Sequence, residues 1–517
     1  MSSNLRIGGL ASGLDIDQMV SDLMKVQRMK VDKIKQNKQI AEWQRDDYRD
    51  INNSLRSLRD NVFNMKLQGT YLVKKASSSN ESIVKATATS SAVPGNYTLK
   101  VISLASTAKL NSSEDVAFNK DATNLKDQLS LSYGGIIKFK VNGSKEIEVD
   151  VDNETIDSLI SKINAAKMSD DKTSAGVTAF FDKTINRMFV FSSSTGANQK
   201  IDFDAVAGFE TQINELFGDK LKLDKNGDPV DGFDWGSEVT GTNAEFVFNG
   251  VTVTTQTSNQ FSLAGINFTL TGTSTTETVN INVTNDTDAV FNSIKSFIDL
   301  YNATLDKINS KLSEERYRDY LPLTDEQREQ LSDDQEKKWE EKAKSGLLKN
   351  DSLLSGIVSK MRSTMTSLVS GVSNSKYDTL AEIGIKTLSY SEKGKLYIDE
   401  TKLKEALAAD PKAVMELFTN SSDTYSNKGL AVRLYDELTN AINTIKDKAG
   451  SSSGYSLVDN SILGKKISGL DKEIASWQDR LKTIENSYWK KFTALEKAIN
   501  QMNSQSAWLA QQFGGKA

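Results

Sequence analysis

The chain has 517 residues, of which 64 are basic and 69 acidic, and its formal charge is -5. Cysteine and histidine are absent, which excludes disulfides, thiol chemistry and every catalytic site or metal centre that needs those side chains. The charge offers no basic surface to a nucleic acid, and no apolar stretch of about 18 residues could span a membrane. We expect roughly three or four domains, without enzymatic activity, cofactor or metal.

The N-terminus has no apolar core of a signal peptide in its first twenty residues, so we expect any export to proceed without cleavage of such a signal. Gly8, Gly9 and Gly13 predict that the first dozen residues lack regular structure. A helix is predicted to begin near Asp15 or Asp17.

This first helix carries two columns of side chains that repeat every seven residues, as in a coiled coil. One column is Val20, Gln27, Ile34, Ala41, Tyr48, Leu55 and Val62. The other is Leu23, Lys30, Asn37, Gln44, Ile51, Leu58 and Met65. The stretch from Tyr48 to Met65 is predicted to be packed core. The polar stretch from Gln27 to Gln44 predicts that the first half of this helix is weakly stable and orders only when a partner binds. Polar seam residues can also fix the register of a coiled coil, at a cost in stability.

Between Ala76 and Val283 the composition changes to Ser, Thr, Val and Asn, with the alternation of strands that have one buried face. The pair Asn249-Gly250 suits a type I′ hairpin turn, and Asn142-Gly143 predicts another hairpin. Further predictions are strands at 97–101, 266–270 and 279–283, a hairpin of 177–181 with 188–191, and an amphipathic helix at 156–163.

Helical patterning returns at Asp288 and continues to the C-terminus. The charged segment 313–345 contains two capping-box patterns and predicts short exposed helices. The other predicted elements are a helix at 351–369, a strand at 395–398, a helix at 400–409 capped by Asp399, a helix from Pro411 capped by Asp410, a helix at 430–445 and a loop at 450–454.

The last helix has the most regular pattern of the chain. Its main column is Ile467, Ile474, Leu481, Tyr488, Leu495, Met502 and Leu509. A second column starts as Leu463, Leu470, Trp477 and Ile484 and then fades to Lys491, Ala498 and Gln505. Such a helix would be about 60–65 Å long, and helices of globular domains rarely exceed about 25 residues. We therefore expect its stripe to meet another helix or another copy of the chain, and we take this column, with Leu23 and Ile34, as the candidate assembly contacts.

Helices at both ends and strands between them predict a multidomain α+β protein in which the chain goes out and comes back. The expected parts are a terminal coiled-coil leg, a helical stem, an inner β domain and an outer inserted domain. Their predicted residues are 1–45 with 462–517 for the leg, 46–75 with 286–461 for the stem, 76–108 with 241–285 for the inner domain, and 109–240 for the outer domain.

Four segments carry a resemblance to a known family. They are GGLASGLDIDQMVSDLM at 8–24, YTLKVISLASTAKL at 97–110, DTLAEIGIKT at 378–387 and GKLYIDETKLKEALAADPKAVMELF at 394–418. The chain resembles the flagellar filament cap proteins, the FliD or hook-associated protein 2 family, over roughly residues 1–110 and 280–517. Residues 110–240 resemble no family.

The resemblance implies a coiled-coil leg, a helical stem and two β domains, one inserted in the other. It also implies a homo-oligomeric ring of about five copies at the tip of the bacterial flagellum. There the ring would promote flagellin polymerisation and prevent loss of exported flagellin. The implied partners are other copies of the chain, flagellin, the filament tip and the flagellar type III export apparatus, and the implied location is extracellular.

A surface adhesin that binds mucin or glycans through the outer domain is the alternative function. The two terminal heptad helices favour the cap, because an adhesin does not need them. A glycan-cleaving enzyme is the third reading, but the paired acids Glu314-Glu315 and Asp333-Asp334 have no apolar surroundings that would raise a pKa.

Two ligand-binding motifs are incomplete or absent. The stretch 224–228 has the acidic spacing of half a calcium loop, but Pro229 and Trp235 stand where such a loop needs Gly and Glu. No phosphate-binding G-x-x-x-x-G-K-[ST] motif occurs. Trp43 and Trp477 lie on the coiled-coil helices and are interpreted as packing residues.

Overall fold

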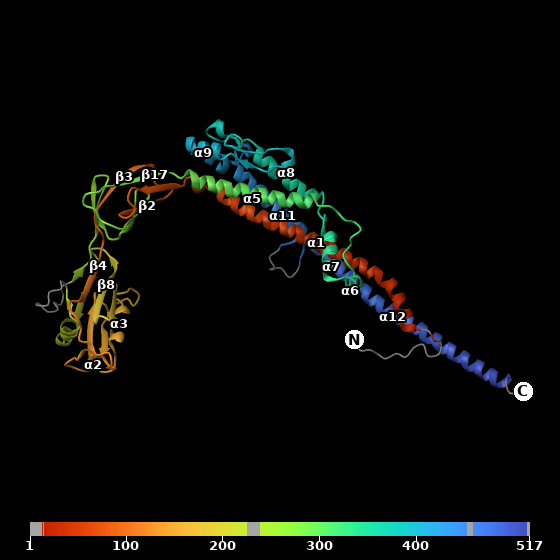
Figure 1. Cartoon of the computed structure of the whole chain (residues 1–517), viewed down its shortest axis with the longest axis horizontal. Helices are drawn as coiled ribbons and strands as arrows, with labels where there is room; N and C mark the ends of the chain where they lie inside the picture. The colour runs from red at the N-terminus through yellow and green to blue at the C-terminus, as the bar shows by residue number, and fades with distance from the viewer. Residues whose placement is uncertain (1–12, 14, 225–237, 452–458, 514–517) are drawn as a thin grey trace. The chain divides into compact units, whose positions relative to one another are not determined.

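The computed structural model describes residues 13, 15–224, 238–451 and 459–513 (Figure 1). The chain divides into two compact units. The helical unit combines Met1–Tyr71 with Thr287–Ala517, and the β unit is Leu72–Asp286. The predicted multidomain α+β fold, with helices at both ends and a β-rich middle, is confirmed. The predicted disorder of the first dozen residues and most of the predicted loop at 450–454 lie outside the described residues.

The helical unit is built mainly from long helices that lie side by side (Figure 1). Its elements are α1 (Ile16–Met65), η1 (Gln68–Thr70), α5 (Thr287–Ser313), α6 (Asp325–Glu329), α7 (Asp333–Lys344), α8 (Ser352–Thr366), η3 (Ser375–Tyr377), β18 (Ile385–Lys386), η4 (Tyr390–Glu392), β19 (Tyr397–Ile398), α9 (Glu400–Ala409), α10 (Pro411–Thr419), η5 (Tyr425–Asn427), α11 (Leu430–Ala449) and α12 (Ile462–Phe513).

The C-terminal half of α1 is the centre of this unit. Its two seven-residue columns are buried from Tyr48 to Met65, where α1 packs against α5 and α11. The Tyr48 hydroxyl donates a hydrogen bond to Asp351 Oδ2 over 2.6 Å, and Lys307 of α5 pairs with Asp50 over 2.7 Å. The predicted core at 48–65 is confirmed.

Local capping chemistry sets most helix starts, as predicted. The Asp15 side chain accepts a hydrogen bond from the backbone of Gln18, so α1 begins at Ile16. Both capping boxes form, at the starts of α6 and α7. Asp351, Asp399 and Asp410 cap α8, α9 and α10. The strand predicted at 395–398 is shorter than expected and pairs as β19 with β18.

Arg433 of α11 is a fully buried cation, at 1% exposure, and has no acidic partner among the described residues. Its guanidinium donates to Ser367 Oγ over 2.6 Å, to Leu368 O over 3.0 Å and to Ser426 O over 2.8 Å. It also lies 4.8 Å from the Tyr425 ring centroid. Burial lowers the pKa of Arg433. This side chain therefore ties the segment that follows α8, and the short helix η5, to α11.

Replacing Arg433 by methionine is expected to lower the free energy of unfolding of the helical unit by about 3 kcal/mol, because three acceptors lose their donor. Arg59→Met is the control, since Arg59 is partly exposed and pairs only with its neighbour Asp60 in the described structure. Chemical denaturation followed by circular dichroism measures both. Equal, small effects would mean that Arg433 does not hold these segments.

The β unit contains most of the strands of the chain. Its elements are β1 (Lys74–Ser78), β2 (Val84–Ala88), β3 (Gly95–Ser103), β4 (Thr107–Ser112), α2 (Leu125–Leu129), β5 (Ile136–Val141), β6 (Ile147–Asp150), α3 (Ile156–Asn164), β7 (Val177–Asp182), β8 (Arg187–Thr195), β9 (Lys200–Ile201), β10 (Phe203–Ala205), α4 (Glu210–Ile213), η2 (Asn214–Lys220), β11 (Leu223–Asp224), β12 (Val239–Thr240), β13 (Ala244–Phe248), β14 (Val251–Gln256), β15 (Gln260–Leu263), β16 (Ile266–Leu270) and β17 (Val279–Asn285).

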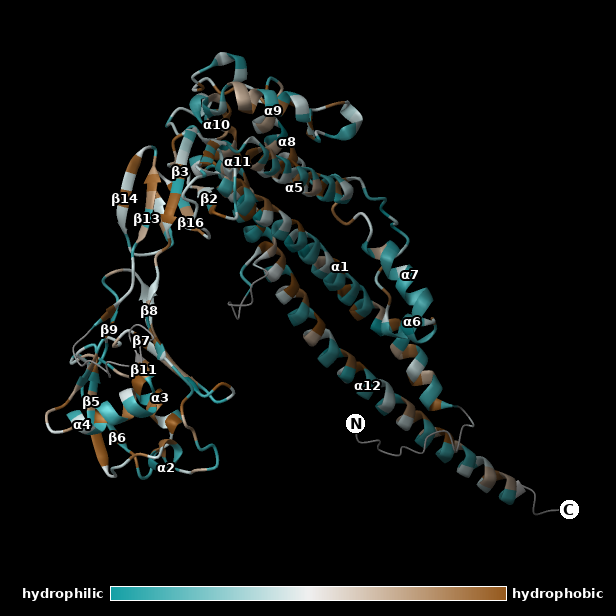
Figure 2. Ribbon diagram, turned by 60° about the vertical axis from the view of Figure 1, so that its left-hand side comes forward, coloured by the Kyte–Doolittle hydropathy of each residue, from teal (hydrophilic) through white to brown (hydrophobic). Residues whose placement is uncertain are grey.

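These strands surround two hydrophobic cores. One core lies between the sheets β1-β17-β3-β13-β14 and β15-β16-β2, and includes Leu99, Phe246 and Phe268. The other involves the sheets β11-β4-β8-β7 and β10-β5-β6 with α3, and includes Phe139 and Phe217. Figure 2 shows apolar stretches along strands such as β13. The chain enters the second core through β4 and returns to the first at β13.

The predicted hairpins are present. Asn249 and Gly250 both have positive φ, 48° and 83°, as a type I′ turn requires, and they join β13 to β14. Asn142 and Gly143, with φ of 51° and 69°, follow β5, which pairs with β6. The strands β7 and β8 also pair as predicted.

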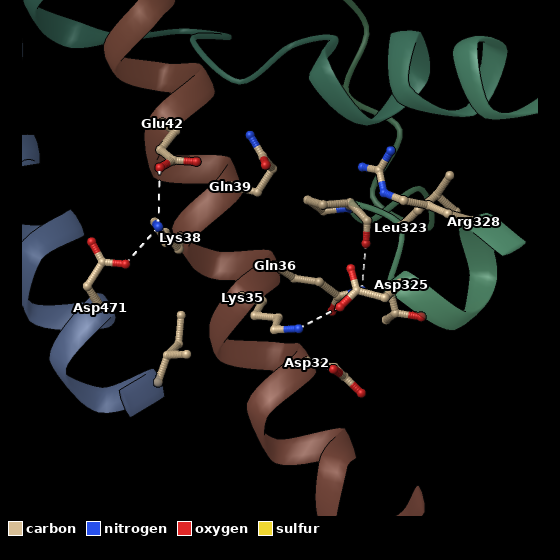
Figure 3. A pocket seen from close by; sticks show the side chains of 13 residues that line it. Asp32, Lys35, Gln36, Lys38, Gln39, Glu42, Leu323, Asp325, Arg328 and Asp471 are labelled. Atoms are coloured by element: carbon tan, nitrogen blue, oxygen red, sulfur yellow. Dashed lines mark hydrogen bonds and ion pairs between the residues drawn. The ribbon is translucent and has the colours of Figure 1, made fainter. Parts of the chain in front are cut away.

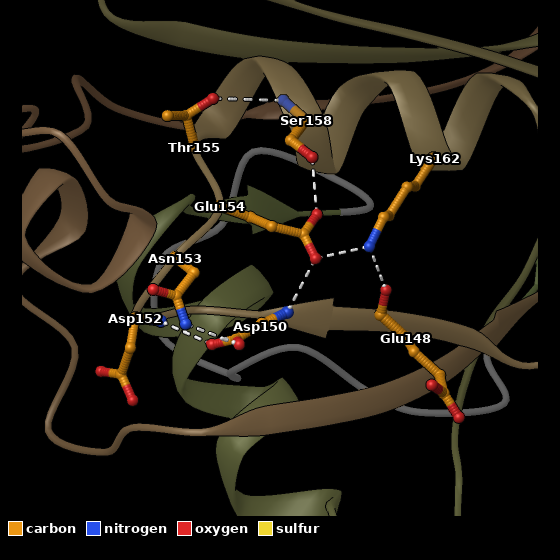
Figure 4. A network of polar contacts seen from close by, with 8 residues as sticks. All are labelled: Glu148, Asp150, Asp152, Asn153, Glu154, Thr155, Ser158 and Lys162. Carbon is orange, nitrogen blue, oxygen red and sulfur yellow. Dashed lines mark hydrogen bonds and ion pairs between the residues drawn. The ribbon is translucent and has the colours of Figure 1, made fainter.

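A polar network fixes the turn between β6 and α3 (Figure 4). Glu154 accepts hydrogen bonds from the Asp150 backbone over 3.0 Å, from Lys162 Nζ over 2.5 Å and from Ser158 Oγ over 2.6 Å. Thr155 caps the helix by accepting from the Ser158 backbone. Burial alone would raise the pKa of Glu154, but the hydrogen bonds from Lys162 and Ser158 outweigh it and hold the pKa below its usual value.

The network predicts a pH-dependent stability of α3. Because the folded-state pKa of Glu154 is lowered, its contribution is present above the unfolded pKa of about 4.3 and is lost as pH falls through the folded value. Glu154→Gln should weaken amide protection of α3 by about 1 kcal/mol near neutral pH, and the difference from the unmodified chain should shrink toward pH 3.

The matched control is Asp157→Asn, which removes an exposed carboxylate of the same helix that pairs with Lys183. Hydrogen exchange of residues 156–164 between about pH 6 and pH 3 measures both variants. A difference for Glu154→Gln that stays constant over this range would contradict the assignment.

Candidate assembly surface

The two terminal helices, α1 and α12, pair in antiparallel orientation (Figure 1). Lys38 Nζ of α1 lies 2.7 Å from Asp471 Oδ1 of α12. Earlier in α1, Lys30 Nζ lies 5.3 Å from the Trp477 ring centroid. As the residue number increases along α1, the number of the contacting residue in α12 decreases, which is the mark of an antiparallel pair. The predicted pairing of N- and C-terminal helices is confirmed.

The start of α1 forms a small apolar cluster with the middle of α12. Ile16, Val20 and Met24 are buried there. The side chains of α12 that pack against them are Leu481, Ile484, Tyr488, Trp489 and Phe492. Two residues of the main predicted column, Leu481 and Tyr488, therefore contact α1 within the same chain and are half-buried by it.

The second column predicted for the N-terminal half of α1 is wrong. Leu23 is 40% exposed, and Lys30 and Asn37 are exposed as well. Met24 and Val31, one residue later, are buried instead. The α-helix has 3.6 residues per turn, so a stripe drifts against a strict seven-residue repeat, and here it changes phase before Tyr48. A strict seven-residue repeat could not show that Met24 and not Leu23 is buried, because both side chains are apolar.

Ion pairs lie beside the polar middle of the seam (Figure 3). Lys38 bridges Asp471 and, over 3.6 Å, Glu42. Lys35 pairs over 2.6 Å with Asp325, at the start of α6. The hydrogen bond with Asp471 raises the pKa of Lys38. Such partly exposed pairs contribute at most about 1 kcal/mol each, so they fix the register of the helices more than they stabilise them.

Three further candidate residues lie along this part of the seam. Ile467 is buried, and Ile34 and Ile474 are half-buried. Ile474 lines a pocket of about 350 Å³ between α1, α12 and the segment 322–328. Within the lining of this pocket Lys35 pairs with Asp325 and Lys38 pairs with Asp471, as Figure 3 shows.

Beyond Phe492 the column continues without a partner. Leu495, Met502 and Leu509 are 46%, 65% and 46% exposed. They lie on one side of α12 because seven residues are close to two turns, and we call them the terminal stripe. The end of α12 extends past the start of α1 in both views (Figures 1 and 2). Among the described residues, no helix covers this stripe.

An exposed apolar stripe is suited to packing against another chain, and its side chains carry no catalytic group. Burying a leucine or methionine side chain contributes about 1.5–3 kcal/mol, and contiguous exposed apolar surface commonly marks a contact site.

Within the part of the chain that the structure describes, no three His, Cys, Asp or Glu side chains cluster as metal ligands. The half calcium loop at 224–228 lies outside that part except for Asp224. In the described ranges no helix is long and apolar enough to cross a bilayer.

The paired acids and the tryptophans have structural contacts. Glu314 pairs over 3.1 Å with Lys311, and Glu315 accepts from the Tyr317 hydroxyl. Asp333 and Asp334 lie in the first turn of α7. The two tryptophans pack under cations: Lys344 lies 5.1 Å from the Trp43 ring, and Lys30 and Arg480 lie near Trp477.

Comparison with known families gives two matches. Residues 12–108 match the model of the flagellar hook-associated protein 2 N-terminus, and residues 241–504 match that of its C-terminus. Between these matches lie residues 109–240, whose described part forms much of the second core of the β unit.

Relatives extend the similarity to the whole chain. Flagellar hook-associated protein 2 of Halalkalibacterium halodurans is 34% identical over 98% of this chain and 100% of its own length. That of Thermotoga maritima is 26% identical over 99% of this chain and 96% of its own length. The crystal structure of the D1-D2-D3 domains of the Escherichia coli flagellar cap protein covers 82% of this chain and 99% of that chain. It has a TM-score of 0.51 at 20% identity, a likeness of fold.

Proposed function

This chain belongs to the flagellar hook-associated protein 2 family, and we propose that it caps the distal tip of the bacterial flagellar filament. In this role it promotes polymerisation of exported flagellin and prevents its loss to the medium. The observation that carries the proposal is the terminal stripe, since a helix end with an apolar column and no partner in its own chain needs partners in an assembly.

The assembly has two kinds of contact in this proposal. Copies of the chain associate with one another in a ring of about five, and the leg contacts the helices at the filament tip. We assign the leg to 1–45 and 462–517, the stem to 46–75 and 286–461, the inner β domain to 76–108 and 241–285, and the outer domain to 109–240. The limits of the β unit at Leu72 and Asp286 support the main division.

The candidate contacts divide by burial in this scheme. Ile34, Ile467, Ile474, Leu481 and Tyr488 hold the leg together within one chain. Leu23 and the terminal stripe remain exposed and contact other chains. We propose that the chain reaches the outside of the cell through the flagellar type III export apparatus, without cleavage of a signal peptide. No observation on the relatives or the described residues favours the glycan-binding adhesin.

Complementation tests the proposal. A strain that lacks its own copy of this gene should release flagellin as monomer and carry short or absent filaments. Expression of this chain should restore filaments and clear flagellin from the medium. Normal filaments in the deletion strain, with the chain absent, would rule out a capping role.

A further inference from the structure

Two Asn-Gly turns of the β unit differ in how the asparagine side chain is held. Asn249-Gly250 joins β13 to β14, and Asn142-Gly143 follows β5. All four residues have positive φ, so the two turns have similar backbones. In an Asn-Gly pair the backbone nitrogen of the glycine can attack the neighbouring side-chain amide, because glycine has no side chain that shields this nitrogen. The surroundings of each turn therefore decide whether that reaction occurs in the folded chain.

The Asn142 side chain is half-buried and is held by hydrogen bonds at both of its polar atoms. Its Nδ2 donates to Ala175 O over 2.8 Å and to Lys200 O over 2.9 Å. Its Oδ1 accepts from the backbone N–H of Asp202 over 2.9 Å. Attack on this amide would require the side chain to turn and to give up these bonds, so the fold protects Asn142 from reaction.

The Asn249 side chain is exposed and is held through its oxygen alone. Among the described residues, neither its Nδ2 nor the backbone N–H of Gly250 donates a hydrogen bond. The space around Gly250 is open, since a Cβ built there would meet no atom within 4 Å. Asn249 Oδ1 accepts from the backbone N–H of Thr98 over 2.8 Å. A donor on a carbonyl oxygen stabilises the negative charge that develops when the carbon is attacked.

We propose that Asn249 is a site of spontaneous deamidation in the folded chain and that Asn142 is not. The Gly250 backbone nitrogen gives its proton to solvent and bonds to Asn249 Cγ. The bond from Cγ to Nδ2 breaks, and Nδ2 takes a proton from solvent and leaves as ammonia, so a cyclic succinimide remains. Water then adds to one of the two imide carbonyl carbons and opens the ring to aspartate or isoaspartate. Water is the only other reactant, and the proposal does not depend on the capping function.

The reaction would change the edge of one sheet of the β unit. The strand β14 lies at the end of the sheet β1-β17-β3-β13-β14 (Figure 2). Both products place a carboxylate in the turn, and isoaspartate also adds a methylene to its backbone, which a type I′ turn does not accommodate. We therefore expect faster amide exchange of Val251–Gln256 in the modified chain. The strands β3 and β17 should keep their protection, because they lie inside the sheet.

Peptide mapping by mass spectrometry tests the proposal on the full chain, after incubation at mildly alkaline pH without denaturant. The deamidated peptide that contains Asn249 should accumulate at least about tenfold faster than the one that contains Asn142, because the hydrogen bonds of Asn142 must break first. Protein isoaspartyl methyltransferase should label the Asn249 peptide and not the Asn142 peptide. A third pair, Asn226-Gly227, lies outside the described residues, and its peptide is measured separately.

The same chain in urea is the matched control, since it keeps both Asn-Gly sequences and loses the hydrogen bonds around Asn142. Both peptides should then react at similar rates. Asn249→Gln is the second control, because the longer side chain would have to close a larger ring; the amide exchange of 251–256 in this variant should not change during incubation. Equal rates at Asn249 and Asn142 in the folded chain, no product at Asn249, or the same difference between the two peptides in urea would overturn the proposal.

Discussion

Replacement of Leu495 and Leu509 together by lysine is expected to abolish filament growth while the chain keeps its fold. The double change removes two apolar contacts, each worth about 1.5–3 kcal/mol, and places charge in the contact. In a ring the loss repeats in every copy. Both side chains are exposed, so the melting transition should not change. Cells with this variant should export flagellin and lose it to the medium as monomer, measured by filament length and free flagellin.

The matched control for the terminal stripe is Asn500→Lys with Ser504→Lys. Both positions are exposed, and at about 100° per residue they lie on the other side of α12. This control adds the same charge to the same helix end and should leave filaments of normal length. Normal filaments with the stripe variant, stably made and exported, would show that the stripe is not how the chain holds the tip.

Leu55→Ala is expected to destabilise the helical unit by about 2–5 kcal/mol, the usual cost of a cavity in a packed core. Leu55 is completely buried where α1 packs against α5 and α11. Met24→Ala is the comparison, because Met24 is buried only in the small cluster near the start of α1. It should raise amide exchange of residues 16–31 and leave the protection of 48–65 unchanged.

Chemical denaturation gives the free energies of unfolding for these two variants, and hydrogen exchange shows where each acts. The expected result is a global effect of Leu55→Ala and a local effect of Met24→Ala. A global loss of equal size from Met24→Ala would mean that the two halves of α1 unfold as one unit.

Elements set by local chemistry could be predicted from the sequence. The caps Asp399 and Asp410 and the Asn249-Gly250 turn depend on residues next to one another, and they form as expected. The seven-residue repeat from Tyr48 onward was also enough to predict the buried core of α1, because both columns there are apolar. Fold class followed from the order of these elements.

Features that depend on distant residues could not be predicted. Asp325 and Asp471, far away in the sequence, supply partners for Lys35 and Lys38 in the polar half of α1, and no local pattern identifies them. The burial of Arg433 likewise depends on carbonyl groups of separate segments.

The candidate assembly residues show the same limit. Leu481 and Leu495 occupy equivalent positions of one column, yet α1 covers the first and not the second. A repeat identifies an apolar side of a helix, and only the ends of the neighbouring helix decide which part of that side is free. The sequence therefore located the column but not the terminal stripe.

Immunogold electron microscopy of intact flagella tests the capping claim most directly. Antibodies against residues 72–286, the β unit, would be applied to cells that express this chain. If the chain caps the filament, label is expected at the distal tip of each filament and nowhere along its length, with no label on filaments that lack the chain. Label distributed along the filaments, or confined to the cell body, would contradict it.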